Sequence, residues 1–425
     1  MTIEHRVKLP WCLAWRISVG QIVSWGILYY AFTVVVGPMQ AATGWSRPFL
    51  NAGLSLGLLT WGICAFPAGV WIQRRGGRGI MTLTSVVGGG ALALIGFAST
   101  PGIYLVAWIL LGAAMAGVLY EPAFAVVTAY FGPYYRRGIT LVTLVGGLAS
   151  TAFIPLAQLA VEQRGWRDAL ISLGVLQTIV CAPLYFFGIP RHRGRTVIAR
   201  DATAISTHAR VAAWWIELRR DISDPRFFGL ALWFTAHAAT FSGLIFQLVP
   251  ILQNARVPTA TTLQAIALIG PMQVLGRLAL ATWGKHLATL CVGGWAMLVL
   301  GTSLALMLFL HLTLASLLAF AVLYGASNGV MTILRGTAIA ELFGRERYAE
   351  LNGALSLPAV LAKAASPFAV AALWTATERY ESVFAAGLAF VVVGVVGLRI
   401  AKRVQSSREL RAESISATAV GEIAN

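Results

Sequence analysis

Twelve long apolar runs dominate this sequence, and they constrain its fold more than any other feature. The runs cover roughly residues 17–39, 49–72, 80–98, 103–131, 139–161, 169–189, 227–253, 261–283, 287–310, 313–343, 354–376 and 382–401. Each is close to the ~20 residues that an α-helix needs to cross a bilayer. Because the bilayer core offers no water to backbone polar groups, such runs form helices with internal hydrogen bonds. The sequence therefore predicts an all-α membrane protein with twelve transmembrane helices.

The composition supports a membrane protein and excludes an ordinary soluble one. Hydrophobic residues make up 58% of the 425 residues, charged residues only 11%, and the mean hydropathy is +0.76. A soluble domain carries about 25% charged residues, so this chain could not cover a surface in contact with water. The net charge of +16 would favour nucleic-acid binding in a soluble protein. Here the basic residues lie in short loops between apolar runs, so we expect a lipid bilayer as partner and no nucleic acid.

The distribution of basic residues predicts the orientation in the membrane. If the N-terminus is cytoplasmic, 24 of the 32 Lys and Arg residues lie on the cytoplasmic side and five lie in the outer loops. Positively charged loops stay on the cytoplasmic side, so both termini are expected there. In the longest cytoplasmic loop, Trp214 and Trp215 precede Arg219 and Arg220. This pattern predicts a short helix along the inner membrane surface.

The two halves of the chain share features at an offset of 212 residues. Three pairs of positions show it: Pro38 with Pro250, Gly117 with Gly329, and Pro155 with Pro367. The offset indicates two six-helix repeats in the same orientation, an architecture of transporters whose binding site lies between the halves. We therefore expect four segments: an N-terminal half 1–189, a basic cytoplasmic loop 190–226, a C-terminal half 227–402 and a cytoplasmic tail 403–425.

The loop after the second run carries a motif that connects the chain to a known family. In "GVWIQRRGGR", Gly69, Arg74, Gly76 and Arg78 match the signature between the second and third helices of the major facilitator superfamily. The resemblance covers essentially the whole chain and implies that family's fold. Gln73 stands where the family carries an acidic residue. The charge-relay and gating role of the signature therefore does not follow from the resemblance here.

Three further motifs resemble the monocarboxylate-porter-like branch of that superfamily, which includes the oxalate:formate antiporter and lactate transporters. They are "SWGILYYAF" in the first run, "GWRDAL" after the fifth and "GPMQVLGRL" in the eighth. The resemblance implies an organic anion as substrate, with Arg277 as carboxylate anchor and Lys363 as a second cation. Proton-coupled relatives carry an acid one turn before the arginine. Gln273 occupies that place, so the resemblance does not support a proton cycle there.

Arg277 and Lys363 also stand out on physical grounds. A charged residue at the centre of a transmembrane helix costs at least about 2.5–3.5 kcal/mol, so each one indicates a functional site. The rise per residue places the two cations at similar depths in the membrane. A planar guanidinium and a mobile ammonium at one depth could hold a carboxylate between them. For each cation, the alternative is a snorkelling or internally paired side chain that only holds helices together.

Glu121 and Arg335 are the other two charges inside the runs, and the sequence leaves their role open. The fourth and tenth helices line the central cavity of the family fold, so these residues could face each other as a buried ion pair that closes a gate. Alternatively, Arg335 is a third contact for the anion and Glu121 accepts protons. Three cations against one acid would favour a dianion or two monoanions and disfavour a cationic substrate.

Several polar residues are weaker candidates. His237 in the seventh run could titrate near neutral pH and serve in coupling or gating, although a hydrogen-bonded buried histidine is the simpler interpretation. Tyr29 and Tyr30 in the first run could line the binding site or pack against neighbouring helices. Gln273, one turn from Arg277, could orient that arginine or bind the substrate.

These observations predict a secondary transporter of the bacterial-type inner membrane that moves a small mono- or dicarboxylate by alternating access. A proton or a counter-anion could drive it, and the family fold implies a monomer. The sequence contains no nucleotide-binding loop, metal-ligand cluster or catalytic constellation, so we expect neither an enzyme nor a cofactor or metal. Efflux of an amphipathic or neutral small molecule by the same fold is the alternative.

Overall fold

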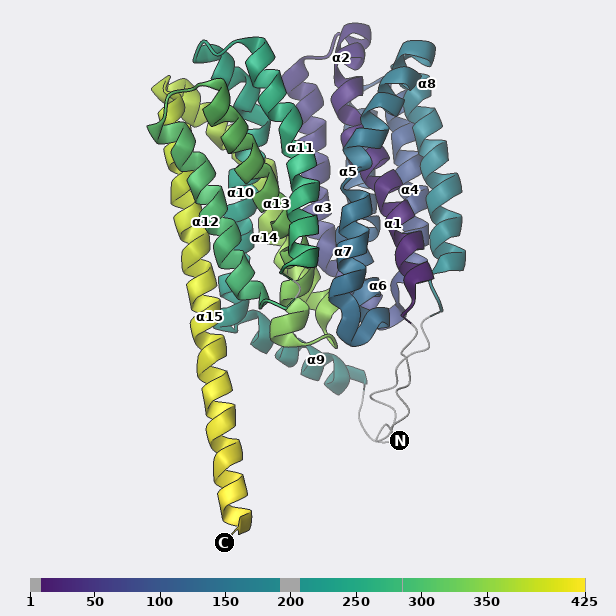
Figure 1. Ribbon diagram of the computed structural model, residues 1–425. Coiled ribbons are helices and arrows are strands. Elements are labelled where there is room, and N and C mark those ends of the chain that lie inside the picture. The colour runs from purple at the N-terminus through teal and green to yellow at the C-terminus, as the bar shows by residue number, and fades with distance from the viewer. Residues whose placement is uncertain (1–8, 192–206, 285, 425) are drawn as a thin grey trace.

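The computed structural model describes residues 9–191, 207–284 and 286–424, and in this part of the chain all regular secondary structure is helical. The elements are α1 Trp11–Trp25, η1 Gly26–Tyr30, α2 Phe32–Thr43, α3 Arg47–Arg75, α4 Gly77–Phe97, α5 Pro101–Val118, α6 Tyr120–Phe131, η2 Gly132–Tyr134, α7 Tyr135–Gly146, α8 Ala149–Gly188, α9 Thr207–Ile222, α10 Pro225–Asn254, α11 Thr259–Thr282, α12 Thr289–Phe309, α13 Leu314–Phe343, α14 Tyr348–Thr377 and α15 Tyr380–Ala424. The long helices run side by side in one bundle (Figure 1).

The predicted transmembrane fold is confirmed. In the described chain, ten segments are long and apolar enough to cross a membrane, and one of them, Pro101–Gly188, contains three of the twelve predicted runs. Two turns divide that segment, one at η2 and one at Gly165 within α8. The φ of 76° at Gly165 is a conformation that other residues rarely adopt. The ten segments therefore accommodate the twelve predicted crossings.

Three of the predicted runs are interrupted, which the apolar pattern did not predict. The first run passes from α1 through the π-helix η1 into α2, the fourth breaks at Leu119 between α5 and α6, and the fifth breaks at Gly147 and Leu148 between α7 and α8. The break at Leu119 follows from Pro122, which lacks the N–H that a continuous helix needs but fits the first turn of a new one. π-Helical turns are frequent at functional sites, and η1 contains Tyr29 and Tyr30.

The helices of the N-terminal and C-terminal runs meet most closely where α3 packs against α14. A Cβ at Gly69 would lie 2.2 Å from the backbone oxygen of Ala349, and a Cβ at Gly353 would lie 2.5 Å from that of Ala65. No larger residue fits at either glycine without a shift of the backbone. Both contacts lie toward the end of the bundle at which α1 begins, α15 ends and α9 is found (Figure 1). We call this the basic end, because the basic loops cluster there.

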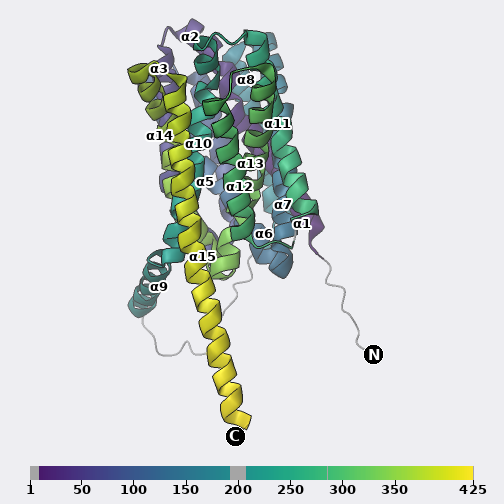
Figure 2. The ribbon, with the colours of Figure 1, turned by 60° about the vertical axis from the view of Figure 1, so that its left-hand side comes forward.

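The predicted C-terminal tail and the predicted central loop, both at the basic end, contain helix. The predicted tail 403–425 is helical as far as it is described, because α15 continues to Ala424 and projects from the bundle (Figure 2). This part of the chain lacks proline, the residue least compatible with a helix interior. Residues 192–206 of the predicted basic loop lie outside the described residues. Within the rest of that loop, Thr207–Ile222 form α9, at the position of the predicted surface helix.

Candidate substrate-binding site

Lys363, in the middle of α14, is surrounded by aromatic rings. Its Nζ lies 4.6 Å from the ring centre of Tyr29, 5.4 Å from that of Trp61 and 5.6 Å from that of Trp25. At such distances the electron-rich faces of the rings attract an ammonium group. Among the described residues, no carboxylate oxygen lies within 4 Å of this nitrogen. The rings hold the cation in place without neutralising its charge.

Arg277, in α11, is buried at the contact with α7 and is only 4% exposed. Its Nη1 donates to the backbone oxygen of Thr143 at 3.1 Å, while its Nε is buried without a hydrogen-bond partner. A Cβ at Gly147 would lie 1.7 Å from Nη1, so the guanidinium fits only because this position is glycine. As with Lys363, no carboxylate oxygen of the described chain lies within 4 Å.

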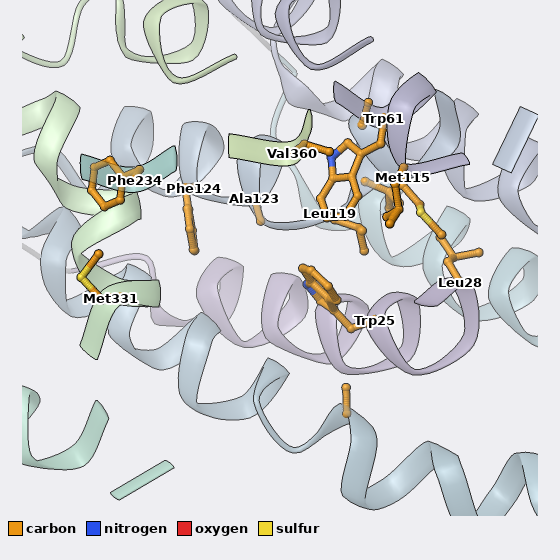
Figure 3. Close-up of a cluster of buried hydrophobic side chains, with 14 of the residues drawn as sticks. Trp25, Leu28, Trp61, Met115, Leu119, Ala123, Phe124, Phe234, Met331 and Val360 are labelled. Atoms are coloured by element: carbon orange, nitrogen blue, oxygen red, sulfur yellow. The ribbon is translucent and has the colours of Figure 1, made fainter. Parts of the chain in front are cut away.

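Five aromatic side chains connect these two cations, and we call them the aromatic cluster. Trp25 lies at the centre of the cluster. Its ring centre is 4.9 Å from that of Tyr120, 5.4 Å from that of Tyr29, 5.7 Å from that of Trp61 and 6.3 Å from that of Tyr30. Figure 3 shows Trp25 and Trp61 near each other beside Leu119. Lys363 lies against three of the rings. The hydroxyl of Tyr120 packs on Gly146, and Arg277 packs on the next residue, Gly147.

Three hydrogen-bond donors in this region are buried without an acceptor. They are Nε1 of Trp25, Nε1 of Trp61 and Nε of Arg277. Buried donors are almost always paired in folded proteins, and an unpaired one costs about 1–3 kcal/mol. A carboxylate supplies negative charge together with about four lone-pair positions. The region therefore offers the donors and the positive charge that an organic anion would satisfy.

Gln273 lies one turn from Arg277 in α11, but its side chain is directed to α13. Its Oε1 accepts a hydrogen bond from Nδ2 of Asn328 at 2.9 Å. A Cβ at Gly329 would lie 2.0 Å from the backbone oxygen of Gln273, so the backbones of α11 and α13 are in contact here. Gln273 thus helps to fix the helix that carries Arg277.

Arg335, in α13, belongs to a separate polar group. Its Nη1 donates to Oδ1 of Asn352 at 2.5 Å, and its Nη2 donates to Oγ of Ser356 at 2.7 Å. Oγ of Ser356 in turn lies 3.3 Å from Oε1 of Glu121, to which it donates, whereas Oε2 of Glu121 is buried without a partner. Glu121 and Arg335 are therefore linked through Ser356 and not by a direct ion pair.

His237 is buried on the side of α10 that faces α13. Its ring stacks at 6.2 Å on that of Phe241, which in turn stacks at 4.8 Å on Tyr324 of α13. Its Nε2 is buried and lacks a hydrogen-bond partner. One turn before it, Phe234 lies 5.4 Å from the guanidinium of Arg335. His237 thus lies one turn from a residue that contacts Arg335, and its expected role in coupling or gating stays a prediction.

The signature loop between α3 and α4 lies at the basic end and contacts the C-terminal helices. Gly76 ends α3 with a φ of 79°, which permits the sharp turn into α4. Gln73 takes the place of the family's acidic residue, and its Nε2 donates to the backbone oxygen of Glu346. This position therefore bridges to the loop before α14 through an amide hydrogen bond and not through an ion pair.

The two signature arginines lie over aromatic rings. The guanidinium of Arg74 is 4.7 Å from the ring centre of Trp214 in α9, and that of Arg78 is 4.2 Å from the ring centre of Phe186 in α8. Both contacts are in the range of cation–π attraction. Arg78 connects helices of the N-terminal half, whereas Arg74 reaches the helix that follows the central loop.

An ion pair that the sequence did not predict closes the basic end between α7 and α13. Nη2 of Arg136 lies 2.5 Å from Oε2 of Glu341, and Nη1 of Arg136 donates to the backbone oxygen of Leu287 at 3.0 Å. Oε1 of Glu341 also accepts from the backbone N–H of Thr289 at 2.9 Å. These contacts join the first and second halves of the chain on this side of the membrane.

Sequence reasoning also missed two members of the aromatic cluster. Trp61 and Tyr120 lie within apolar runs, where an aromatic residue gives no sign of whether it faces lipid, a neighbouring helix or the centre of the bundle. The position of Tyr120 directly before Glu121 was the one available signal. For Arg136 and Glu341, the signal was their charge at the ends of runs, which is common for residues in solvated loops.

The long apolar helices of the fold define a membrane protein. The chain matches the Major Facilitator Superfamily over residues 17–316, well over half of its length, and it belongs to that family. It is therefore an integral membrane protein and a secondary transporter rather than an enzyme.

Solved structures of the same fold cover nearly the whole chain. The human organic anion transporter MFSD10 (TETRAN) superposes with a TM-score of 0.68 and 15% identity, covering 92% of this chain and 99% of that one. A variant of the E. coli fucose:proton symporter FucP superposes with a TM-score of 0.70 and 12% identity, covering 92% of this chain and 98% of that one. At these identities the likeness establishes the fold alone.

Sequence relatives are distant. An uncharacterized MFS-type transporter of Bacillus subtilis, YcxA, is 24% identical over 281 residues, which is 61% of this chain and 65% of that protein. The chain thus spans just under two thirds of the length of this relative. Monocarboxylate transporter 12 of Rattus norvegicus is 24% identical over 356 residues, which is 75% of this chain and 72% of that protein.

Proposed function

We propose that this protein transports a small organic anion, a mono- or dicarboxylate, that binds between Arg277 and Lys363. The observation that carries the proposal is a pair of cations inside the membrane without an acidic partner among the described residues. Nε of Arg277 and the indole N–H groups of Trp25 and Trp61 are also buried without an acceptor. Charges at this depth are costly, so they are retained where a ligand needs them. A sequence relative named for monocarboxylates agrees with such a substrate.

In this proposal the two cations have different tasks. Arg277 binds a carboxylate through Nε and one Nη, the geometry in which a guanidinium forms two parallel hydrogen bonds. Lys363 attracts the remaining negative charge, because a flexible ammonium adapts to anions of different length. The indole N–H groups of Trp25 and Trp61 donate to the other oxygen atoms, and Tyr29 and Tyr30 form part of the wall. Gln273 keeps α11 against α13.

The charge of the site selects for negative substrates. Glu121 offsets the charge of Arg335, to which it is linked through Ser356. The charges of Arg277 and Lys363 are left for the ligand, which favours one dianion or two monoanions and disfavours cations. Glu121, with one unpaired oxygen, is the candidate to carry a coupled proton. Exchange for a second anion is the other means of coupling that this charge permits.

The state of the bundle fits one stage of alternating access. The ion pair of Arg136 with Glu341 and the close contact of Gly69 with Ala349 close the basic end. We assign this end to the cytoplasm of a bacterial-type inner membrane, because positively charged loops stay on that side. Substrate then enters from the opposite end, and separation of the two halves at the basic end releases it to the cytoplasmic side.

Thermal unfolding of the purified protein, with a panel of mono-, di- and tricarboxylates, tests the proposal. A ligand that binds only the folded state raises stability by about 2.7 kcal/mol at 100 times its Kd. We expect stabilisation by at least one acid, its loss in Arg277→Ala, and its retention in Arg379→Ala, which removes an exposed arginine near the opposite end. If no acid stabilises the wild type, or if Arg277→Ala keeps the effect, the proposed anion site is wrong.

The aromatic cluster is the observation that favours the second candidate, efflux of an amphipathic or neutral molecule. The ring of Trp25 and four rings with centres within 6.3 Å of its own form an apolar surface. An amphipathic or neutral compound could stack on this surface. The two functions differ in their competitors. Transport of a neutral compound into vesicles should be unaffected by added carboxylates, whereas transport of an anion at Arg277 and Lys363 should be inhibited by them.

A further inference from the structure

The helix α9 has one face that is fixed to the bundle at the basic end. Nε1 of Trp214 donates to Oε1 of the buried Glu350 at 2.8 Å, and Asp221 accepts from Nη1 of Arg347 at 2.7 Å. Leu218, which lies between them on the same face at helical spacing, is buried. Glu350 and Arg347 lie at the start of α14, so this face of α9 is attached to the C-terminal half.

The same face of α9 also contacts the N-terminal half. The guanidinium of Arg74, in the last turn of α3, lies 4.7 Å from the ring centre of Trp214. Trp214 is therefore held by Glu350 of α14 on one side and by Arg74 of α3 on the other. These are the two helices that come into backbone contact at Gly69 and Ala349. Opening of the basic end, which separates α3 from α14, must break the contact of Arg74 with Trp214.

The next face of α9 is exposed and combines apolar and basic side chains. Trp215 is 52% exposed and Ile216 is 69% exposed, and Arg219, Arg220 and Ile222 are exposed beside them. At 3.6 residues per turn, Trp215, Arg219 and Ile222 fall on one line along the helix. In the view of Figure 2, α9 projects beyond the outline of the bundle at the basic end. The exposed face thus belongs to a helix that stands outside the bundle at the basic end.

We propose that the exposed face of α9 binds anionic phospholipid headgroups and that this contact stabilises the closed basic end. Tryptophan and isoleucine enter the boundary between headgroups and acyl chains, while arginines above them pair with phosphates. Each basic residue near an anionic leaflet contributes about 1 kcal/mol. The basic end faces the cytoplasmic leaflet by its loop charges, and that leaflet carries the negative surface potential.

Lipid binding is coupled to closure of the basic end because α9 is one rigid helix with a lipid-binding face and a face fixed to the bundle. Lipid bound to the outer face keeps α9 in the orientation in which Trp214 meets both Glu350 and Arg74. Anionic lipid therefore favours the state in which α3 and α14 are in contact, and a neutral membrane favours opening. This regulation does not depend on which substrate is carried, so it stands or falls separately from the proposed anion site.

Hydrogen exchange of the full-length protein in lipid nanodiscs tests the proposal. One set of nanodiscs contains phosphatidylcholine alone, and the other an equal mixture of phosphatidylcholine and phosphatidylglycerol. In the wild type we expect the backbone amides of α9 to exchange more slowly in the anionic discs, by roughly five-fold for each arginine that contacts lipid. The double variant Arg219→Gln, Arg220→Gln should lose this difference. The start of α14 should follow the same pattern, since it moves with α9.

The control variant is Arg403→Gln, which removes one exposed basic residue of α15 at the same end of the protein. It should keep the lipid dependence of α9. Exchange in α9 that is equal in both kinds of nanodisc would overturn the lipid contact. An equal loss in the control would also overturn it, because the effect would then come from overall charge and not from this face. Protection of α9 without any change at the start of α14 would overturn the coupling to closure.

Discussion

The Nζ of Lys363 lies 4.6 Å from the ring centre of Tyr29, and among the described residues no carboxylate lies within 4 Å of it. An aromatic face attracts a cation through its quadrupole but brings no opposite charge. The ammonium is therefore oriented by rings while its charge stays available. This distinguishes Lys363 from Arg347, whose guanidinium is neutralised by three acidic side chains at the basic end.

Replacement of Lys363 by methionine should weaken anion binding by about ten- to a hundred-fold, as expected for the loss of a charged hydrogen bond of about 1.5–3 kcal/mol. The methionine side chain keeps the apolar contacts with Trp25 and Trp61, so folding should be preserved. Titration of a stabilising carboxylate against both proteins gives the two Kd values. Equal Kd values would show that Lys363 does not contact the ligand.

Replacement of Arg277 by methionine should abolish ligand-induced stabilisation and leave the ligand-free protein at least as stable as the wild type. The reason is that the native guanidinium is buried with its Nε unpaired, so its removal relieves a desolvated charge. Thermal unfolding with and without ligand measures both effects. A marked loss of stability without ligand would instead indicate that Arg277 holds α11 against α7 through Thr143.

Replacement of Gly69 by alanine should hinder closure of the basic end. The added Cβ would lie 2.2 Å from the backbone oxygen of Ala349, and overpacking of this kind costs about 1–3 kcal/mol. Transport in proteoliposomes should fall by about ten-fold or more, since about 1.4 kcal/mol corresponds to ten-fold. Gly79→Ala is the matched control, because nothing lies within 4 Å of a Cβ there. Equal transport by both variants would contradict the closure role of Gly69.

Replacement of Arg136 by glutamine should increase the population that is open at the basic end. The ion pair with Glu341 is partly exposed, so its contribution is about 0.5–1 kcal/mol, or a two- to five-fold shift. Hydrogen exchange at the start of α14, where Ala349 meets Gly69 of α3, reports the opening. Adding Glu341→Gln to Arg136→Gln should increase the open population little further. Replacement of the exposed neighbour Arg137 by glutamine should leave the open population unchanged. Full additivity of the two changes would exclude the coupling.

Replacement of Ser356 by alanine should uncouple Glu121 from Arg335. Its hydroxyl donates to Oε1 of Glu121 and accepts from Nη2 of Arg335, so it is the described link between the two charges. We expect the double variant Ser356→Ala, Glu121→Gln to lose less free energy of unfolding than the two single variants lose in sum. The difference should be about 0.5–3 kcal/mol, because the effects of neighbours in one network are not additive. Chemical unfolding of the four proteins measures this. Additive effects would show that the link has no energetic weight.

Twelve apolar runs, the basic loops and the position of each intramembrane charge could be obtained from the sequence alone. Length and polarity determine whether a segment spans a bilayer, and both are local properties. The signature loop was enough to recognise the family. The sequence also placed Arg277 and Lys363 at similar depth, because depth follows from the rise per residue along a helix.

The tertiary structure decided which faces of the helices meet. In a bilayer, lipid-facing and buried faces are both apolar, so hydrophobic periodicity does not report how a helix is rotated. The placement of Lys363 on the rings of Trp25 and Tyr29 depends on that rotation and on the π-helical turn of η1. Glu121 is linked to Arg335 through Ser356, and Glu121 and Ser356 are 235 positions apart in the sequence. Such contacts exist only once the helices are packed, and they determine which charges are paired and which have no acidic partner among the described residues.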